Sequence, residues 1–232
     1  IMTGLHGVYG WSGWQWVFLI EGVPSIIAGF AVWAYLTDRP EQARWLSDEE
    51  RRLVIDDLAR DAQVQGHREE SLLASLRDRR IWVLIATFFC IIAANSALTF
   101  FGPTVVKEAG FPDPVTVGWI MALLYCFGAV GMIGNGILSD RNQESRLHCG
   151  LAATLGAAGL AMTALFIHSS PILALAVLAL AIMGTMGAIP VFWQLPGRFL
   201  AGSAAAGGVA LINSFANLAG FGAPALLGQI KT

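Results

Sequence analysis

Long uncharged stretches alternate with short polar connections along most of this chain of 232 residues. A stretch of about 20 apolar residues is long enough to cross a bilayer as an α-helix. The pattern predicts the tail of one such helix followed by six complete ones, at 14–36, 80–106, 116–138, 148–168, 171–194 and 205–230. The predicted fold class is therefore all-α, a polytopic membrane helical bundle.

Composition supports this prediction and excludes an ordinary soluble domain. The chain is 56% hydrophobic and 13% charged, whereas soluble domains carry about 25% charged residues. Cys90, Cys126 and Cys149 lie in or beside the apolar stretches, without the spacing of a disulfide framework or a zinc site. We expect free cysteines, no metal and no other cofactor. We expect a lipid bilayer as surroundings and no nucleic-acid partner.

Positive charge gives the predicted helices an orientation. Nine of the 14 Lys and Arg residues lie between Asp38 and Arg80, and loops rich in these residues mark the cytoplasmic side. We therefore expect residues 38–79 to be a cytoplasmic linker between two membrane regions, 1–37 and 80–232. The expected location is the inner (plasma) membrane.

A local signal predicts a helix inside this linker. Ser47 and Glu50 have the spacing of a capping box, and the residues up to about Ala62 are helix formers with charges of both signs. A second short helix is expected from Ser71 to Leu76. We interpret the segment as a solvated helical connection rather than a ligand site.

Small residues recur inside the apolar stretches. Because lipid offers no hydrophobic force between helices, close approach of backbones across small residues is a main source of packing. The stripes therefore indicate a tightly packed bundle. They consist of Gly128, Gly131, Gly134 and Gly136 in one predicted helix, and of Gly184, Gly187 and Ala188 in another.

Glu21 interrupts the first complete apolar helix. An ionised group within the hydrocarbon costs about 2.5–3.5 kcal/mol on insertion scales, so it usually faces the bundle interior or a water-filled cavity. Trp11, Trp14 and Trp16 mark the outer end of this helix, and Glu21 lies about one-third of the way down. Glu21 is a candidate proton-coupling carboxylate, and the alternative is a structural acid that is protonated or hydrogen-bonded.

Polar side chains in three other predicted helices are candidates for contacts with a polar substrate. An amide inside a span can bind a substrate or hydrogen-bond to another helix. A tryptophan can line a cavity or anchor at the interface. Both alternatives stay open for each candidate. The candidates are Asn95 and Thr99, with Ser96 beside them, then Trp193 and Gln194, and finally Asn213 and Asn217.

Prolines accompany these candidates. Pro103, Pro190 and Pro224 lie inside apolar stretches, where a proline removes a backbone hydrogen bond and bends the helix. Broken helices often line transport pathways. Asn213, Asn217, Gly220 and Pro224 are three or four residues apart and share one helical face.

The most specific motif is Gly136-Ile-Leu-Ser-Asp140-Arg141, followed by Arg146. It resembles the cytoplasmic loop motif of the major facilitator superfamily, G-x-x-x-D-R with further basic residues, at the loop between transmembrane helices 8 and 9. Asp140 can cap a helix end or pair with an arginine, and Gly136 permits close contact. The loop would then act as a latch between helices. The alternative is an ordinary cytoplasmic turn.

Further motifs resemble the anion:cation symporter family of this superfamily, especially its tartrate- and phthalate-permease-like branch. They are Gly13 to Pro24, Asp38 to Pro40, Ala43 to Arg51 and Gly202 to Ser214. The resemblance implies a piece of the fold from the end of helix 5 to helix 11, without helices 1–4 and 12. It also implies a secondary transporter of small organic anions, coupled to protons or sodium, that works by alternating access.

The same resemblance implies roles for individual residues. Trp193 and Asn213 match a tryptophan of helix 10 and an asparagine of helix 11 that contribute to the family's substrate site. Glu21 belongs to the family's helix 6 pattern. Two departures stand out: helix 7 reads Phe100-Phe101-Gly102-Pro103 where an aromatic-Trp-Leu-Pro sequence is usual, and the loop motif has Gln143 in place of a glycine.

Two other classes of function are weighed against transport. A membrane enzyme needs a convergent catalytic set, whereas the histidines are scattered without evident partners. A receptor or scaffold that does not transport remains possible on the same fold, because a fold alone does not fix function. The histidines are His6, His67, His148 and His168.

Overall fold

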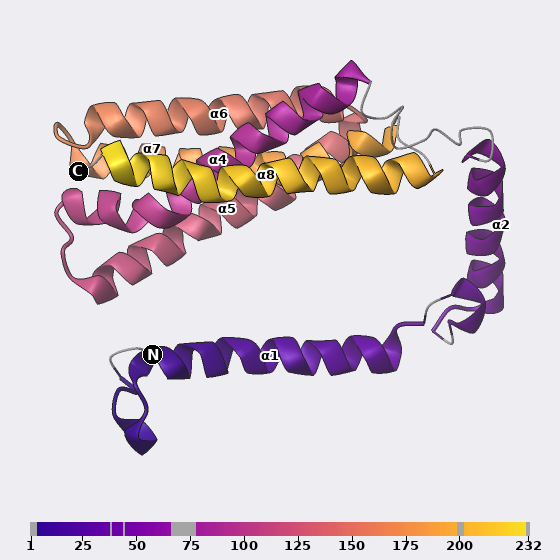
Figure 1. Cartoon of the computed structure of the whole chain (residues 1–232), viewed down its shortest axis with the longest axis horizontal. Coiled ribbons are helices and arrows are strands. Elements are labelled where there is room, and N and C mark those ends of the chain that lie inside the picture. Colours follow the sequence, from indigo (N-terminus) through magenta and orange to yellow (C-terminus); the bar gives the residue numbers. More distant parts are fainter. Residues whose placement is uncertain (1–3, 38, 44, 66–77, 199–201, 231–232) are drawn as a thin grey trace. The chain divides into compact units, whose positions relative to one another are not determined.

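A computed structural model describes residues 4–37, 39–43, 45–65, 78–198 and 202–230. Within these ranges the regular elements are all helices, without a strand, so the predicted all-α class is confirmed (Figure 1). The chain divides into two compact units, Ile1–His67 and Arg68–Thr232.

The first unit contains one long apolar helix, α1 (Gly13–Tyr35). Ahead of it lie turns and a short 3₁₀ helix, η1 (Val8–Gly10), rather than a regular helix. Glycines explain this start, because Gly7 and Gly10 have φ angles of 84° and 76°, a left-handed conformation that ends helices. Residues 1–3, where the predicted tail of a preceding helix begins, lie outside the described ranges.

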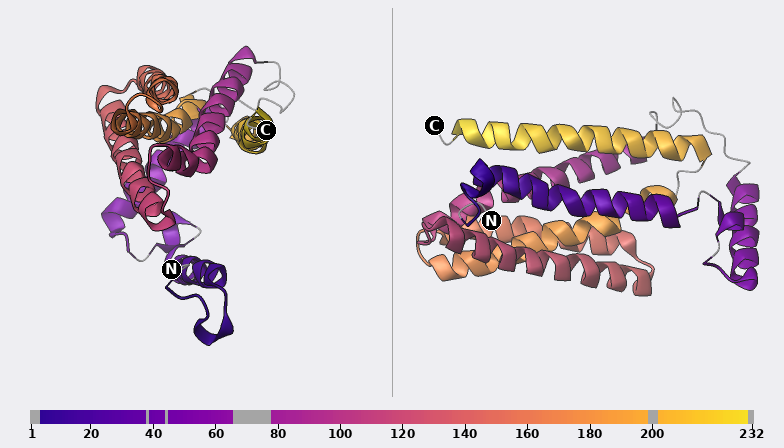
Figure 2. Two further views of the ribbon diagram at one scale, coloured as in Figure 1. Left: turned by 90° about the vertical axis from the view of Figure 1, so that its left-hand side faces the viewer. Right: turned by 90° about the horizontal axis from the view of Figure 1, so that it is seen from below.

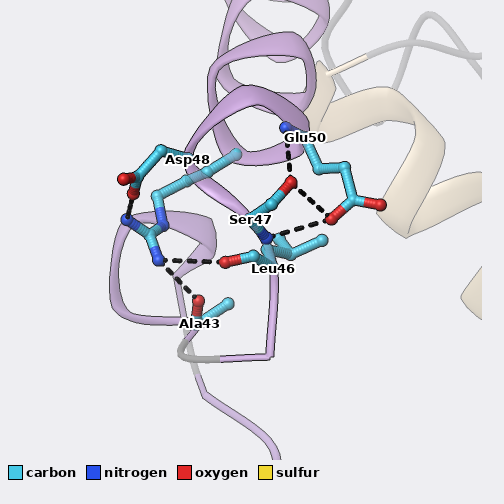
Figure 3. Close-up of polar contacts among 6 residues, drawn as sticks. Ala43, Leu46, Ser47, Asp48 and Glu50 are labelled. Carbon is cyan, nitrogen blue, oxygen red and sulfur yellow. Dashed lines mark hydrogen bonds and ion pairs between the residues drawn. The ribbon is translucent and has the colours of Figure 1, made fainter.

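The capping box at the start of the linker is confirmed (Figure 3). The Ser47 backbone N–H donates to Glu50 Oε2 at 2.9 Å, and the Glu50 N–H donates back to Ser47 Oγ at 3.3 Å. These bonds begin α2 (Asp48–Gln65), and the hydrogen bond from the Ser47 backbone lowers the pKa of Glu50. The predicted short helix from Ser71 to Leu76 lies outside the described residues.

Arg51 closes the corner that precedes α2. Its guanidinium donates to the carbonyl oxygens of Ala43 and Leu46 at 3.0 and 3.2 Å, and it pairs with Asp48 at 2.8 Å (Figure 3). The corner also contains the 3₁₀ helix η2 (Pro40–Gln42). One arginine therefore ties the connection after α1 to the first turn of α2.

Within the described residues, the second unit is a bundle of five long helices, and local side chains set several of their ends. Asp113 caps one of them by accepting the Thr116 N–H at 2.8 Å, and Asp78 caps another by accepting the Arg80 N–H at 2.8 Å. Pro114 and Pro171 open two helices, as expected for residues without an N–H. The helices are α4 (Arg79–Glu108), α5 (Pro114–Asn142), α6 (Ser145–Phe166), α7 (Pro171–Trp193) and α8 (Gly202–Ile230), with η3 (Pro196–Arg198) between the last two.

Helix α7 lies at the centre of this bundle and packs against α4, α5 and α6. Helix α8 packs along α4, and in Figure 2 it lies on the opposite side of the bundle from α6. Among the described residues, five helices are long and apolar enough to cross a membrane: α1, α4, α5, α6 and α7. The chain is therefore a multi-pass membrane protein, and the predicted span over α8 stays a prediction.

Glycines allow α5 and α6 to reach the backbone of α7. A Cβ on Gly131 of α5 would overlap the Met183 carbonyl oxygen, and one on Gly187 would lie 3.0 Å from the Gly131 oxygen. On the other side, a Cβ on Gly184 would overlap the backbone nitrogen of Gly156 in α6. The expected packing across small residues is confirmed at these positions.

The close contact expected for Gly136 is not formed within this bundle. A Cβ on Gly136, or on Gly134, would meet no other atom within 4 Å. The reason is geometric, because Gly136 lies five residues after Gly131 and so points about 140° away from it around the helix axis. Gly136 therefore belongs to a face of α5 that does not touch α7.

We predict that Gly131→Ala and Gly184→Ala each lower the free energy of unfolding by about 1–3 kcal/mol, because a methyl group has no room against the facing backbone. Thermal unfolding of the detergent-solubilised protein measures this. Gly134→Ala is the matched control, since its methyl group enters open space and alanine favours the helix. Equal loss in all three variants would contradict the packing described above.

Candidate functional site

The turn between α5 and α6 carries the loop motif. Gln143 ends α5 with φ 54° and ψ 27°, the left-handed region that glycine enters most easily. The loop motif that this sequence resembles has a glycine at this position, which would adopt these angles without strain. The Gln143 side chain supports the turn here, because its Nε2 donates to the Asp140 carbonyl oxygen at 2.7 Å.

The Gln194 amide ties the end of α7 to this turn. Ser139 and Ser145 are only 1% and 2% exposed, and their hydroxyls donate to Gln194 Oε1 at 3.1 and 2.6 Å. Gln194 Nε2 donates to Asp140 Oδ1 at 2.8 Å. We call Ser139, Asp140, Ser145 and Gln194 the Gln194 clamp. It gives two buried hydroxyls an acceptor that they otherwise lack.

Arg198 extends this network from η3. Its guanidinium donates to the Gln143 carbonyl oxygen and to Ser145 Oγ, both at 3.1 Å. Arg141 and Arg146 are exposed, and the part of the chain that the structure describes contains no ion pair between Asp140 and an arginine. Asp140 instead receives the amide of Gln194. The clamp therefore joins helices within one bundle.

A second polar cluster joins the same three helices one turn deeper. Asn135 Nδ2 of α5 donates to the Gly187 carbonyl oxygen of α7 at 2.8 Å, so its Oδ1 is left as an acceptor. His148 Nδ1 of α6 lies 3.1 Å from Asn135 Oδ1, and His148 Nε2 lies 3.1 Å from Asn142 Nδ2. The network thus assigns the proton of a neutral ring to Nδ1.

Two histidines therefore have partners that sequence reasoning missed. His148 bridges Asn135 and Asn142, and His6 Nδ1 accepts the Gly13 backbone N–H at 3.3 Å. Both roles are structural connections. The polarity of Asn135, directly before Gly136 in an apolar helix, was the available signal for this cluster.

Trp193 is held by aromatic packing at the end of α7. Its ring forms a T-shaped pair with that of Phe88 in α4, with centroids 4.9 Å apart, and Phe88 stacks on Phe192 at 4.5 Å. The Trp193 side chain is half-buried. Its position is therefore fixed by its neighbours, while part of its ring stays accessible.

The predicted amides of α8 lie on an exposed face of the bundle. Asn213 and Asn217 are exposed, while Ile212, Ala216 and Ala219 on another face of α8 are buried. Gly220 is directed toward α4, because a Cβ there would lie 3.5 Å from Ser96 Oγ. The side chain of Pro224 lies outside the described residues.

Asn95 and Thr99 belong to a short hydrogen-bonded chain that also includes Tyr125. Thr99 Oγ1 donates to the Asn95 carbonyl oxygen at 2.9 Å, and the Tyr125 hydroxyl of α5 donates to Thr99 Oγ1 at 3.3 Å. The Asn95 side chain is half-buried and that of Thr99 is exposed. Tyr125 was missed because its partner lies in another helix.

Glu21 lies in the first unit, on the apolar helix α1. Glu21 is exposed on α1, and its backbone oxygen accepts a hydrogen bond from Ser25 Oγ at 3.4 Å. The described residues contain no group of three or more side chains suited to a metal ion. All three cysteines are free.

We predict that Gln194→Ala lowers the free energy of unfolding by about 1–3 kcal/mol, because buried hydroxyls lose their acceptor. The melting temperature of the purified protein in detergent measures the loss. Arg141→Ala, an exposed change on the same loop, should leave that temperature unchanged. If Gln194→Ala melts like the parent, the clamp contributes nothing to stability.

Comparison with known proteins identifies relatives along almost the whole chain. The model of the Major Facilitator Superfamily matches residues 2–224. A "Putative tartrate transporter" of Agrobacterium vitis is 38% identical over 227 residues, which make up 98% of this chain and 50% of that protein. No solved structure matches the chain at a significant level.

Two further relatives have other names. The "Quinolone resistance transporter" of Acinetobacter baumannii is 30% identical over 232 residues, 100% of this chain and 53% of that protein. The "Inner membrane transport protein RhmT" of Escherichia coli is 34% identical over 235 residues, 98% of this chain and 52% of that protein. The chain thus spans about half the length of the curated relatives it matches.

These relatives are named as transporters, which argues against the membrane enzyme weighed above. The helical bundle, its several apolar spans and the glycine-lined contacts of α7 agree with the match. The family model covers far more than half of the sequence. The chain belongs to the major facilitator superfamily.

Proposed function

We propose that the protein containing this chain is a secondary transporter of small organic carboxylates, such as tartrate, sugar acids or phthalate. It couples their uptake to protons and works by alternating access in the inner membrane. The observation that carries the proposal is the 38% identity with a protein named for tartrate transport, across 98% of this chain. The relative named for quinolone resistance makes the substrate class the point to test.

The substrate contacts that we propose are neutral side chains on α4, α7 and α8. Asn213 and Asn217 present amides one helical turn apart on an exposed face. Amide and hydroxyl groups both donate and accept hydrogen bonds, so they suit the hydroxyls and carboxylate oxygens of a sugar acid. Asn95 and Thr99 offer similar groups on α4, and Trp193 offers a held aromatic ring.

Gln194 takes a different role in this proposal. Its amide makes three hydrogen bonds inside the Gln194 clamp, so it positions the end of α7, next to Trp193, and acts on the substrate indirectly. The same end of the bundle carries Asp140, which accepts from Gln194, and the other residues of the loop motif, Gly136, Arg141 and Arg146. In this proposal the loop motif, which the sequence suggested as a latch, holds α5, α6 and α7 together through these hydrogen bonds.

Glu21 is the proposed coupling carboxylate of the described residues. Coupling requires a group that takes up and releases a proton as the substrate moves, and an acid within a membrane span is suited to this. Glu21 lies on α1, an apolar helix long enough to cross a membrane. Sodium is the alternative coupling ion, and a proton gradient distinguishes the two.

The experiment is uptake of labelled tartrate, galactonate and phthalate into vesicles that contain the product of the full open reading frame including these residues. We expect an inward proton gradient to stimulate uptake of one of these anions, and an uncoupler to remove the stimulation. A sodium gradient serves as the comparison. Absence of uptake for all three anions, with correctly inserted protein, would reject the substrate class.

For the anion that is taken up, Asn213→Ala should lower the uptake rate about tenfold, which corresponds to about 1.4 kcal/mol. The matched control is Ser214→Ala, because Ser214 is equally exposed on α8 and its hydroxyl only donates to the Ala210 carbonyl oxygen at 2.8 Å. Membrane levels of both variants are measured in parallel. Normal uptake by Asn213→Ala would remove Asn213 from the site.

A further inference from the structure

The amide of Asn135 is fixed in one orientation by the groups around it. Its Nδ2 donates to the Gly187 carbonyl oxygen of α7 at 2.8 Å and to the His148 carbonyl oxygen of α6 at 3.4 Å. Carbonyl oxygens only accept hydrogen bonds, so the reverse orientation would set Asn135 Oδ1 against two other acceptors. Asn135 Oδ1 therefore faces the remaining neighbour, His148 Nδ1, at 3.1 Å.

This orientation determines which ring nitrogen of His148 must donate. Nδ1 has to carry the proton in order to donate to Asn135 Oδ1, while Nε2 lies 3.1 Å from Asn142 Nδ2 and accepts from it. With the proton of a neutral ring on Nε2 instead, two acceptors would face each other at Nδ1, and the Asn135 amide would lose its support. The tautomer of His148 is therefore set by its neighbours.

The Asn135 contact lies where the backbone of α7 lacks a hydrogen bond. Pro190 follows Gly187 by less than one turn and has no N–H, so one carbonyl oxygen of the preceding turn loses its usual partner. Sharp bends in helices occur mostly at such prolines. Asn135 holds the turn before Pro190, and the Gln194 clamp holds the helix end after it. The placement of Trp193, directly before Gln194, depends on both attachments.

We propose that His148 is a positioning residue for substrate binding. As the Nδ1–H tautomer, it holds the Asn135 amide on the Gly187 carbonyl oxygen and so fixes the end of α7 that carries Trp193. The inference rests on the proposed function, in which Trp193 contacts the substrate. The hydrogen bonds that support it are all formed between α5, α6 and α7, within one compact unit.

Two substitutions at position 148 separate the Nδ1 donor from the rest of the ring. Asparagine places its amide nitrogen as many bonds from Cβ as histidine places Nδ1, whereas glutamine places it one bond farther, as histidine places Nε2. In uptake by the product of the full open reading frame in vesicles, we expect His148→Gln to raise KM about threefold or more at an unchanged maximal rate. His148→Asn should keep the parental KM.

Asn142→Ala is the matched control on the same cluster. It removes only the partner of His148 Nε2, and Asn142 is exposed, so the KM should stay at the parental value. A double-mutant cycle then tests whether His148 acts through Asn135. Once Asn135→Ala has removed the amide, His148→Gln should raise KM no further.

A spectroscopic measurement tests the tautomer without any substrate. ¹⁵N NMR of the histidine-labelled protein in mildly alkaline detergent solution, where histidine is neutral, distinguishes protonated from unprotonated ring nitrogens. The signal that His148→Asn removes belongs to His148. We expect it to show the proton on Nδ1.

Three results would overturn the inference. They are a proton on Nε2, a parental KM in His148→Gln, and a His148→Asn variant whose KM rises as much as that of His148→Gln. Absence of uptake for all three anions would instead reject the proposed substrate class. The tautomer would still support or overturn the positioning of Asn135 by His148, because the NMR measurement needs no transport.

Discussion

The bundle depends on direct backbone contact between α7 and its neighbours α5 and α6. In lipid, burial of apolar side chains gives little advantage over exposure to hydrocarbon, so helices associate through close packing. Gly131 and Gly187 supply this closeness on one side of α7, and Gly156 and Gly184 supply it on the other. Side chains at these positions would push the helices apart and lose contacts along their whole length.

This contact places the polar groups of the second unit. Once α5, α6 and α7 lie close together, Asn135 reaches the Gly187 carbonyl oxygen and Gln194 reaches Ser139, Asp140 and Ser145. Pro190 lies between these two attachment points and removes one backbone donor of α7. The three helices thus form one body, and the proposed substrate contacts lie at its edges and on α4 and α8.

Sequence reasoning succeeded where the signal is local. The capping box at Ser47 and Glu50 was predictable because its partners are three residues apart. The long helices were predictable because each coincides with a long run of apolar residues. The loop motif from Gly136 to Arg141 was likewise recognised from the sequence. The left-handed Gln143 shows why the glycine missing from that motif matters to the turn.

Sequence reasoning failed where the partner lies on another helix. The hydrogen bonds of Gln194 join residues about 50 positions apart, so its place in the clamp could not be read from spacing. The same holds for the cluster around His148 and for Tyr125. A glycine stripe also does not reveal which of its members faces a neighbouring helix, and Gly136 meets no such neighbour among the described residues.

We propose that α5, α6 and α7 stay joined at the Gln194 clamp throughout the proposed transport cycle. The most direct test introduces cysteines at Ser139 and Gln194, in a protein without its three native cysteines, and joins them with a short reducible cross-linker. The account predicts equal uptake before and after cross-linking of the same variant. Uptake that stops on cross-linking and returns on reduction would show that the clamp opens during transport, and would contradict the account.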